Sequence, residues 1–392
     1  MRLFSVVRKR LNRHAEISRI IRRGKRRFSA DARFDLDFAE QGFAPRAADG
    51  ADDTVLFRRI CEAWSKAMER QPSAPEAFQP HPWWDEIRQK SLGPVTRALA
   101  AHDLDSLRRM YRNFFRDPCS TGVTGLPLGR IQPNSRISRI AKELCLIDGL
   151  HRIDVWKSRT AGRFELSDLK PPNVGNPFGF VLDGVFVRTG SEDQHYCAHR
   201  IIDLIGSFDA PVVAEIGGGF GGMAYYLIRD LPSVTYLNFD MPETIALASY
   251  YLLNAFPEAK AILYGEAELN AETLRSSQII LMPSFAIPQL PPSSVDIAFN
   301  ARILSDLSSA SLHAYLAEIT RTTRGHLLHL NRTEGSNAAD AWLAINAPDF
   351  QLVAKRRSEW NDARTVRPNE MEYLYERRVP RQPPSVPDPH PS

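Results

Sequence analysis

The spacing of apolar residues separates a helical first half of the chain from a second half of a different kind. From residue 54 to about residue 150, apolar side chains recur every three or four positions, as in Leu56, Ile60, Trp64 and Met68. This is the period of an amphipathic helix, so the pattern predicts a helical domain. Prolines between residues 72 and 82, and again between 118 and 127, predict two breaks in it.

Beyond residue 211 the pattern changes to short β-rich runs separated by helical segments. Strands that alternate with helices are joined by right-handed crossovers and pair in parallel. The pattern therefore predicts an α/β fold with a parallel sheet. The predicted strands are Val212–Ile216, Val234–Asp240, Ile279–Met282, Val295–Asn300 and His326–Asn331.

Two last runs, Phe350–Trp360 and Glu370–Val379, are also predicted strands, and only a turn lies between them. Two strands joined without a helix have to pair antiparallel. A mostly parallel, Rossmann-like sheet that ends in a C-terminal antiparallel hairpin is the layout of class I methyltransferases. We expect this fold, preceded by an N-terminal helical domain.

These patterns divide the chain into four regions. They are a basic segment and linker at 1–53, the helical domain with substrate-side loops at 54–190, the α/β domain at 191–379, and a Pro-rich, disordered tail at 380–392. With 43% hydrophobic and 24% charged residues, the composition is that of a folded globular protein.

Positive charge is concentrated at the N-terminus. Residues 1–30 hold eleven Lys or Arg residues against the single acid Glu16, although the net charge of the chain is only +4. As a helix, Met1–Phe28 would be basic and partly amphipathic, and could lie on an anionic membrane or another polyanion. A solvated basic tail is the simpler interpretation. Residues 29–53 are rich in Ala, Asp and Gly and predict a linker.

The cysteines and the hydropathy bear on the compartment. Cys61, Cys119, Cys145 and Cys197 lack the paired spacing of zinc ligands and the density of a disulfide scaffold, which favours reduced thiols. No apolar run reaches the roughly 18 residues that cross a bilayer. We expect a cytoplasmic protein, with peripheral contact to the inner membrane face through Met1–Phe28 as the one membrane role. No nucleic-acid partner is expected.

A glycine turn follows the first predicted strand of the α/β domain. Gly217, Gly218 and Gly219 allow unusual φ angles and let a ligand approach the backbone, which indicates a nucleotide site. Gly217, Gly219 and Gly222 also fit the G-x-G-x-x-G pattern of dinucleotide sites, so an NAD-dependent oxidoreductase is an alternative.

Glu215 favours S-adenosylmethionine as the cofactor, and Asp240 is a candidate for binding its ribose. Glu215, at the end of the strand, stands where a methyltransferase faces the cationic end of its cofactor, and it would repel a pyrophosphate. Helix capping is the other interpretation of Glu215. Asp240, at the end of the second strand, has the position of a carboxylate that accepts the ribose hydroxyls. The residues expected beside the adenine are Met241, Pro283 and Ser284.

The stretch from Asn300 to Asp306 follows the fourth strand, at the edge of the sheet where substrate meets cofactor. We expect Asn300 on the cofactor side, and Arg302 and Ser305 on the substrate side. Helix capping is the alternative, because Ser305 and Asp306 precede a predicted helix at 309–323. Trp83 and Trp84 beside His81 are interpreted as a loop packed on helices, with a ligand platform as the alternative.

These residues resemble those of a family of sugar O-methyltransferases found in bacterial polysaccharide gene sets. The resemblance runs from Arg59 to Arg378 and includes one departure, since the family has Glu-Met where this chain has Asp306-Leu307. It implies transfer of the cofactor methyl group to a sugar hydroxyl, with the helical domain as a lid or substrate wall. The matching segments are Arg59–Trp64, Asn113–Arg116, Gly175–Gly179, His195 with Tyr196, Glu215–Gly222, and Asn300 with Ser305 and Asp306.

Methyl transfer to a hydroxyl requires alignment and a proton acceptor. The candidates for the base are His195 and Asp306. His195 and His199 share the spacing of a metal pair, but no third ligand stands out, so no metal is expected. A third hypothesis, a non-catalytic module that binds a polyanion or membrane, rests on the basic N-terminus. The residues expected to hydrogen-bond the sugar are Asn176, Tyr196 and Asn331, with Arg302 and Ser305.

Overall fold

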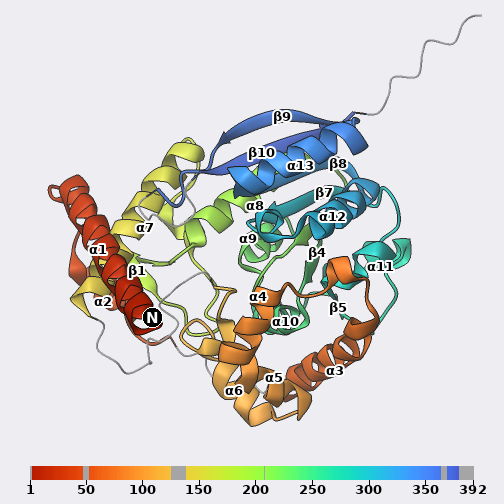
Figure 1. Cartoon of the computed structure of the whole chain (residues 1–392), viewed down its shortest axis with the longest axis horizontal. Helices are drawn as coiled ribbons and strands as arrows, with labels where there is room; N and C mark the ends of the chain where they lie inside the picture. The colour runs from red at the N-terminus through yellow and green to blue at the C-terminus, as the bar shows by residue number, and fades with distance from the viewer. Residues whose placement is uncertain (1, 47–52, 125–137, 207, 363–368, 379–392) are drawn as a thin grey trace, which may run out of the picture.

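The computed structural model describes residues 2–46, 53–124, 138–206, 208–362 and 369–378 (Figure 1). The predicted disordered tail, residues 380–392, lies outside these described residues. The helices are α1 (Arg2–Phe28), α2 (Leu36–Phe43), α3 (Thr54–Arg70), α4 (Pro82–Ile87), α5 (Gly93–Ala100), α6 (Leu104–Tyr111), α7 (Arg139–Arg159), α8 (Ser191–Ile205), α9 (Gly222–Asp230), α10 (Pro242–Ala255), α11 (Ala271–Ser276), α12 (Ser309–Thr322) and α13 (Thr333–Asn346).

An eight-stranded sheet organises the second half of the chain, with strand order β5-β6-β4-β3-β7-β8-β10-β9. The strands from β5 to β8 pair in parallel, while β10 pairs antiparallel with both β8 and β9. The predicted mostly parallel sheet with a C-terminal hairpin is confirmed. The strands of this sheet are β3 (Val212–Ile216), β4 (Thr235–Asp240), β5 (Ala261–Leu263), β6 (Ile279–Pro283), β7 (Val295–Ala301), β8 (Thr323–Arg332), β9 (Phe350–Arg357) and β10 (Glu370–Arg377).

Helices cover both faces of this sheet, because successive side chains of a strand point to opposite faces. Val213 and Tyr236 belong to the core shared with α8, α9 and α10. Ala214 and Leu237 belong to a second core shared with α12 and α13. Strands buried on both faces read as continuous apolar runs, which is why these elements could be predicted.

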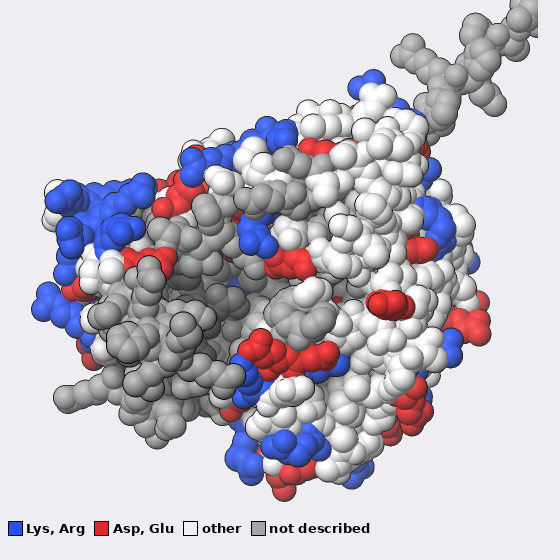
Figure 2. All heavy atoms as spheres, in the orientation of Figure 1, with Lys and Arg blue, Asp and Glu red and all other residues white. Residues whose placement is uncertain are grey.

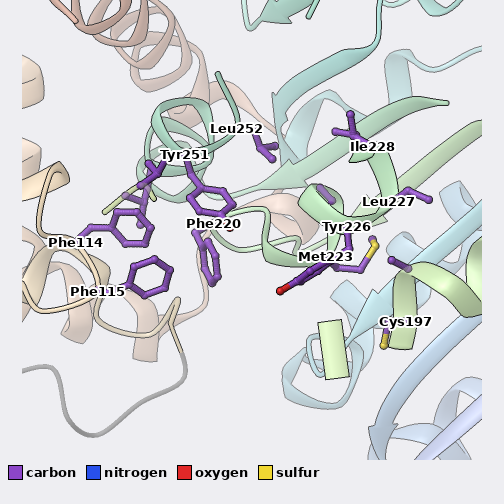
Figure 3. Close-up of a cluster of buried hydrophobic side chains, with 14 of the residues drawn as sticks. Phe114, Phe115, Cys197, Phe220, Met223, Tyr226, Leu227, Ile228, Tyr251 and Leu252 are labelled. Carbon is purple, nitrogen blue, oxygen red and sulfur yellow. The ribbon is translucent and has the colours of Figure 1, made fainter. Parts of the chain in front are cut away.

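The helical first half shares its core with the sheet domain. Figure 3 shows Phe114 and Phe115, which follow α6, beside Phe220 of the glycine turn and Tyr251 of α10. The ring centroids of Phe115 and Phe220 are 5.2 Å apart and those of Phe114 and Tyr251 are 5.9 Å apart, both with edge-to-face geometry. This aromatic cluster fixes the helical region against the glycine turn.

A small hairpin that the sequence analysis did not predict lies between these regions. It consists of β1 (Gly179–Leu182) and β2 (Val185–Arg188), which pair antiparallel. The two residues between them, Asp183 and Gly184, have φ angles of 50° and 75°. An Asp-Gly turn with two positive φ angles is a strong hairpin signal, so the sequence did carry this information.

The N-terminal 46 residues are more ordered than their composition predicts. The expected linker contains α2, whose Gly42 packs so closely that an added Cβ would meet the carbonyl oxygen of Gly179 at 2.2 Å. Phe43 in the same helix is buried and stacks on Phe178 at 5.1 Å. The linker interpretation is therefore wrong for residues 36–43, because apolar side chains hold this segment on β1. The preceding residues form α1, where a solvated tail was the simpler expectation. Within the part of the chain that is described, no helix is long and apolar enough to cross a membrane.

Candidate functional site

A cavity of about 840 Å³ opens at the carboxyl ends of β3, β4 and β7. One side is formed by the glycine turn and the ends of these strands, and the other by α8 and by loops of the helical region. This is the edge of a parallel sheet at which ligands bind. Predicted site residues that line the cavity are Glu215, Gly217, Gly218, Gly219, Asp240, Met241, Ser284, Arg302 and Asp306.

The glycine turn is shaped by close backbone packing. Gly217 has a φ of 75°, and an added Cβ would meet Cγ1 of Ile303 at 2.2 Å. Gly219 has a φ of 58°, and its Cβ position lies 3.5 Å from Val123, which also lines the cavity. The backbone is thereby exposed to a ligand, as a nucleotide site requires.

The amide groups of this turn are already engaged by neighbouring groups. Gly218 donates its N–H to Oδ1 of Asn238 at 3.1 Å, and Gly219 donates to Oδ2 of Asp240 at 2.9 Å. The amide of Gly217 donates to the carbonyl of Phe239 at 2.7 Å. A pyrophosphate would need free N–H groups here, so the turn does not provide the phosphate cradle of a dinucleotide site.

Glu215 is a buried acid with one partner on the neighbouring strand. The hydroxyl of Tyr236 donates to its Oε2 at 2.6 Å. Burial raises the pKa of Glu215 to about 7, an effect that the tyrosine opposes and the nearby Asp240 reinforces. A cation in the cavity would stabilise the ionised form, which matches the charge of the sulfonium cofactor.

Asp240 connects the second strand to the glycine turn. Its carboxylate accepts from the amides of Gly219 at 2.9 Å and Met241 at 2.7 Å, and burial raises its pKa to about 6. These bonds fix the orientation of the carboxylate, which lines the cavity. That geometry fits a group that accepts two ribose hydroxyls.

Two of the three residues expected beside the adenine line the cavity. Met241 and Ser284 line the cavity, together with Tyr315 of α12, which the sequence analysis missed. Pro283 lies at the end of β6 in register with Asp240, but outside the lining. Its predicted contact with the adenine is therefore not supported.

Asn300, Asn331 and Ser305 do not line the cavity, in contrast to the prediction. Asn300 donates to the carbonyl of Ile216 at 2.6 Å and accepts from Asn331 at 2.9 Å. Asn331 in turn accepts from the amide of Ser305 at 3.2 Å. These side chains join the ends of β3, β7 and β8, so they support the cavity floor rather than contact a ligand.

Arg302 and Asp306 do line the cavity, and both are ion-paired. Arg302 has a φ of 76° and donates to Asp193 and to Glu370, each at 2.8 Å. Asp306 is paired with Arg332. Non-glycine residues at positive φ carry backbone strain, which concentrates at functional sites.

His195 lies outside the cavity, so its prediction as the base is wrong. It is fully buried against Trp156, Phe164 and Tyr226, and its Nδ1 accepts from the indole N–H of Trp156 at 3.2 Å. Burial, with His199 nearby, lowers its pKa to about 3. Such a group cannot reach or deprotonate an acceptor.

Asp230 supplies the third group that the sequence analysis did not find beside His195 and His199. One ligand atom from each lies within 4.8 Å of the others. However, Asp230 already accepts from His199 at 3.0 Å and pairs with Arg229 at 2.7 Å. Since Nδ1 of His195 accepts a hydrogen bond, a neutral ring carries its proton on Nε2 and offers no lone pair there. We therefore assign no ion to this cluster.

Asn176 and Tyr196 also lie outside the lining. Asn176 accepts from the amide of Arg46 at 2.8 Å and donates to Asn113 at 2.9 Å. Tyr196 donates to Glu372 at 2.6 Å. Both side chains are hydrogen-bonded to other groups of the protein instead, so the structure does not support their predicted contact with a sugar.

Several lining residues were not among the predicted site residues. Trp84, interpreted from sequence as packing, does pack and donates to Glu243 at 3.0 Å, yet it also borders the cavity, as does His81. From α8, Asp193, Gln194 and Cys197 face the cavity, whereas His195 and Tyr196 do not. The signal that could have separated them is the helical period, which places residues 193, 194 and 197 on one face.

A family model described as the O-methyltransferase domain matches residues 182–288. This segment of the chain is thus similar to an O-methyltransferase domain. The matched segment runs from β1 to the turn after β6 and includes Glu215, Asp240 and Ser284, so S-adenosylmethionine is the cofactor of this site. The match ends before Arg302 and Asp306. No curated protein sequence is significantly similar to the chain.

Solved structures overlap with the chain only in part. The pyocyanin biosynthetic protein PhzM is 14% identical, with 46% of this chain and 54% of PhzM covered and a TM-score of 0.32. This chain therefore spans about half the length of PhzM. A SAM-dependent methyltransferase from Aquifex aeolicus is 14% identical, with 48% of this chain and 93% of that protein covered and a TM-score of 0.33. Magnesium protoporphyrin IX methyltransferase from Synechocystis PCC 6803 is 12% identical, with 48% of this chain and 83% of that protein covered and a TM-score of 0.32. Overlaps of this size carry no argument about activity.

Proposed function

We propose that the protein transfers the methyl group of S-adenosylmethionine to a sugar hydroxyl. One observation carries the proposal: a single cavity joins the glycine turn and its acids to a wall of polar side chains from α8 and from the segment after β7. A volume of about 840 Å³ lies in the upper part of the range for ligand sites, so it suits a cofactor and an acceptor together.

The cofactor half argues against the alternative of an NAD-dependent oxidoreductase. Glu215, a carboxylate beside the glycine turn, lines the cavity and would repel a pyrophosphate bound there. The amides of Gly218 and Gly219 donate to side chains of the protein itself. A cationic ligand with two ribose hydroxyls is favoured by this set of groups, and a doubly anionic one is not.

The acceptor half is rich in groups that bind hydroxyls. Gln194 provides an amide, the Asp193–Arg302 pair provides charged donors and acceptors, and Ser308 and Ser311 provide hydroxyls. Trp84 adds an apolar plane. Sugars present both hydroxyls and an apolar ring face, so this composition supports a sugar acceptor. The assignment to a bacterial polysaccharide or glycoconjugate rests on the resemblance of the sequence.

S-adenosylmethionine, when bound, supplies the electrophilic methyl group. The residues of the chain have to align the acceptor oxygen and receive its proton. Asp306, one of the two predicted bases, and His81 both line the cavity. Histidine is the side chain whose ordinary pKa lies closest to neutral pH. We propose that one of these two groups takes the proton.

Calorimetric titration with S-adenosylhomocysteine tests the cofactor assignment, with NADH as the comparison ligand. We expect micromolar binding by the wild type, and a loss of about 10² to 10³-fold in Asp240→Ala, since two hydrogen bonds to a charged group disappear. Asp209→Ala, which removes an exposed carboxylate before β3, is the matched control and should bind normally. Methyl transfer from labelled cofactor to a panel of sugars then tests the acceptor. Preference for NADH would refute the proposal.

A further inference from the structure

The basic helix α1 is fixed to the body of the protein along one side. An added Cβ at Gly24 would meet the side chain of Ile147 at 2.5 Å, so α1 and α7 are in close contact there. Phe28 is buried, and Lys25 pairs with Glu143 at 2.8 Å. Arg27 pairs with Asp154 at 3.0 Å. These contacts orient α1, and they decide which of its faces remains open.

The open face carries four arginines, which we call the arginine face: Arg19, Arg22, Arg23 and Arg26. Their spacing of three and four residues places them side by side on the helix. All four are exposed, and none makes an ion pair with a described residue. Figure 2 shows Lys and Arg side chains gathered at this left edge of the molecule, over α1.

We propose that the arginine face binds the anionic headgroups of a phospholipid bilayer. The four guanidinium groups repel one another unless negative charge lies near them. A flat anionic surface can contact all four at once. The rest of the chain has the opposite sign. Residues 31–392 hold 39 basic and 45 acidic residues, what remains of 50 and 46 after the eleven bases and one acid of residues 1–30. An anionic membrane would therefore attract α1 and turn the body away from it.

A bilayer fits this face better than a nucleic acid does. Single-stranded nucleic acids are held by basic grooves with aromatic side chains on which bases stack. The exposed positions described in α1 hold Arg, Ala and Ser and no aromatic residue. A row of charges on one face of the helix, with Gly24 and Phe28 on another face buried against the body, is suited to electrostatic contact with headgroups. The inference does not depend on the methyl-transfer activity.

Co-sedimentation of the full-length protein with vesicles tests the proposal. We expect binding to vesicles that contain phosphatidylglycerol, no binding to phosphatidylcholine alone, and a steep loss of binding with added salt. The test variant carries Arg19→Gln, Arg22→Gln, Arg23→Gln and Arg26→Gln. Each arginine near an anionic surface contributes roughly fivefold, so the variant should bind on the order of several hundred-fold more weakly.

The control variant removes the same charge from exposed positions on α3, α6 and α11: Arg58→Gln, Arg70→Gln, Arg109→Gln and Arg275→Gln. It should bind vesicles nearly as well as the wild type. An equal loss in both variants would mean that net charge alone drives binding, and would overturn the proposal. So would absence of wild-type binding at low salt, or tighter binding to DNA than to the vesicles. Circular dichroism of both variants verifies that they are folded.

Discussion

The two ends of the cavity are held in different ways. At the cofactor end, the backbone itself makes the site: strand ends and a glycine turn, tied by the amide bonds of Gly219 and Met241 to Asp240. At the acceptor end, side chains from distant segments meet, and Arg302 holds Asp193 of α8 and Glu370 of β10 in place. The first end depends on local geometry and the second on long-range ion pairs, so different substitutions should break them.

The largest effect is expected at Arg302, because its loss removes the arginine paired with the buried Glu370 and one of the two arginines paired with the buried Asp193. Removing one member of a buried ion pair costs about 3–5 kcal/mol. Arg302→Ala should lower the free energy of unfolding by this amount in urea denaturation. Arg302→Lys retains the charge but cannot donate to both carboxylates as the guanidinium group does. Its free energy of unfolding should fall by less than that of Arg302→Ala. A stable Arg302→Ala variant with only a raised KM for the sugar would instead make Arg302 a direct substrate ligand, as the sequence analysis predicted.

At the cofactor end, Gly217→Ala tests the backbone geometry. The new Cβ would meet Ile303 at 2.2 Å, at a φ of 75°. Strain at positive φ costs about 1–2 kcal/mol, and overpacking adds about 1–3 kcal/mol. Gly162→Ala is the matched control, since Gly162 has a φ of 68° and nothing within 4 Å of its Cβ position. Thermal denaturation should show the greater loss for Gly217→Ala, together with weaker S-adenosylhomocysteine binding. Equal losses would exclude the close packing.

The base at the acceptor end should account for about a 100-fold effect on kcat. Asp306→Asn and His81→Gln remove the two candidates, and His313→Gln, at an exposed position of α12, serves as the control. The variant that lacks the base should lose kcat and the acid limb of its pH–rate profile. The other variant should change KM alone. If both retained the wild-type kcat, proton transfer to either group would be excluded and alignment alone would carry the reaction.

The same contrast between backbone and side chains explains what the sequence could predict. Glu215 and Asp240 were located because a strand end beside a glycine turn has only one place in a parallel sheet. His195 and Tyr196 were not, because neighbouring residues of α8 differ by about 100° in direction, and only the packing decides which face meets the cavity. Asn300 was predicted at the correct edge of the sheet, but its side-chain amide donates a hydrogen bond to the carbonyl of Ile216 and does not face the cavity. His81 comes from a loop whose position depends on tertiary packing.

The smallest expected effect, the pH dependence of cofactor binding, distinguishes the two ends most directly. Glu215 and Asp240 have pKa values raised to about 7 and about 6. The ligand-free protein therefore holds these protons more tightly than the unfolded chain, and loses stability as the pH rises from about 4 to 7. A cationic ligand favours the ionised acids, so its binding should release protons and weaken about tenfold between pH 8 and pH 6.

Calorimetry with S-adenosylmethionine in buffers of different ionisation enthalpy measures that release. Glu215→Gln should remove the component of proton release centred near pH 7 and leave the component due to Asp240. Asp306→Asn, at the acceptor end, should leave both components of the proton release unchanged. Affinity independent of pH in the wild type would mean that the two acids do not face the positive charge of the cofactor. In that case the cofactor end would be held by the backbone geometry alone, and its charge would have no role in selecting the ligand.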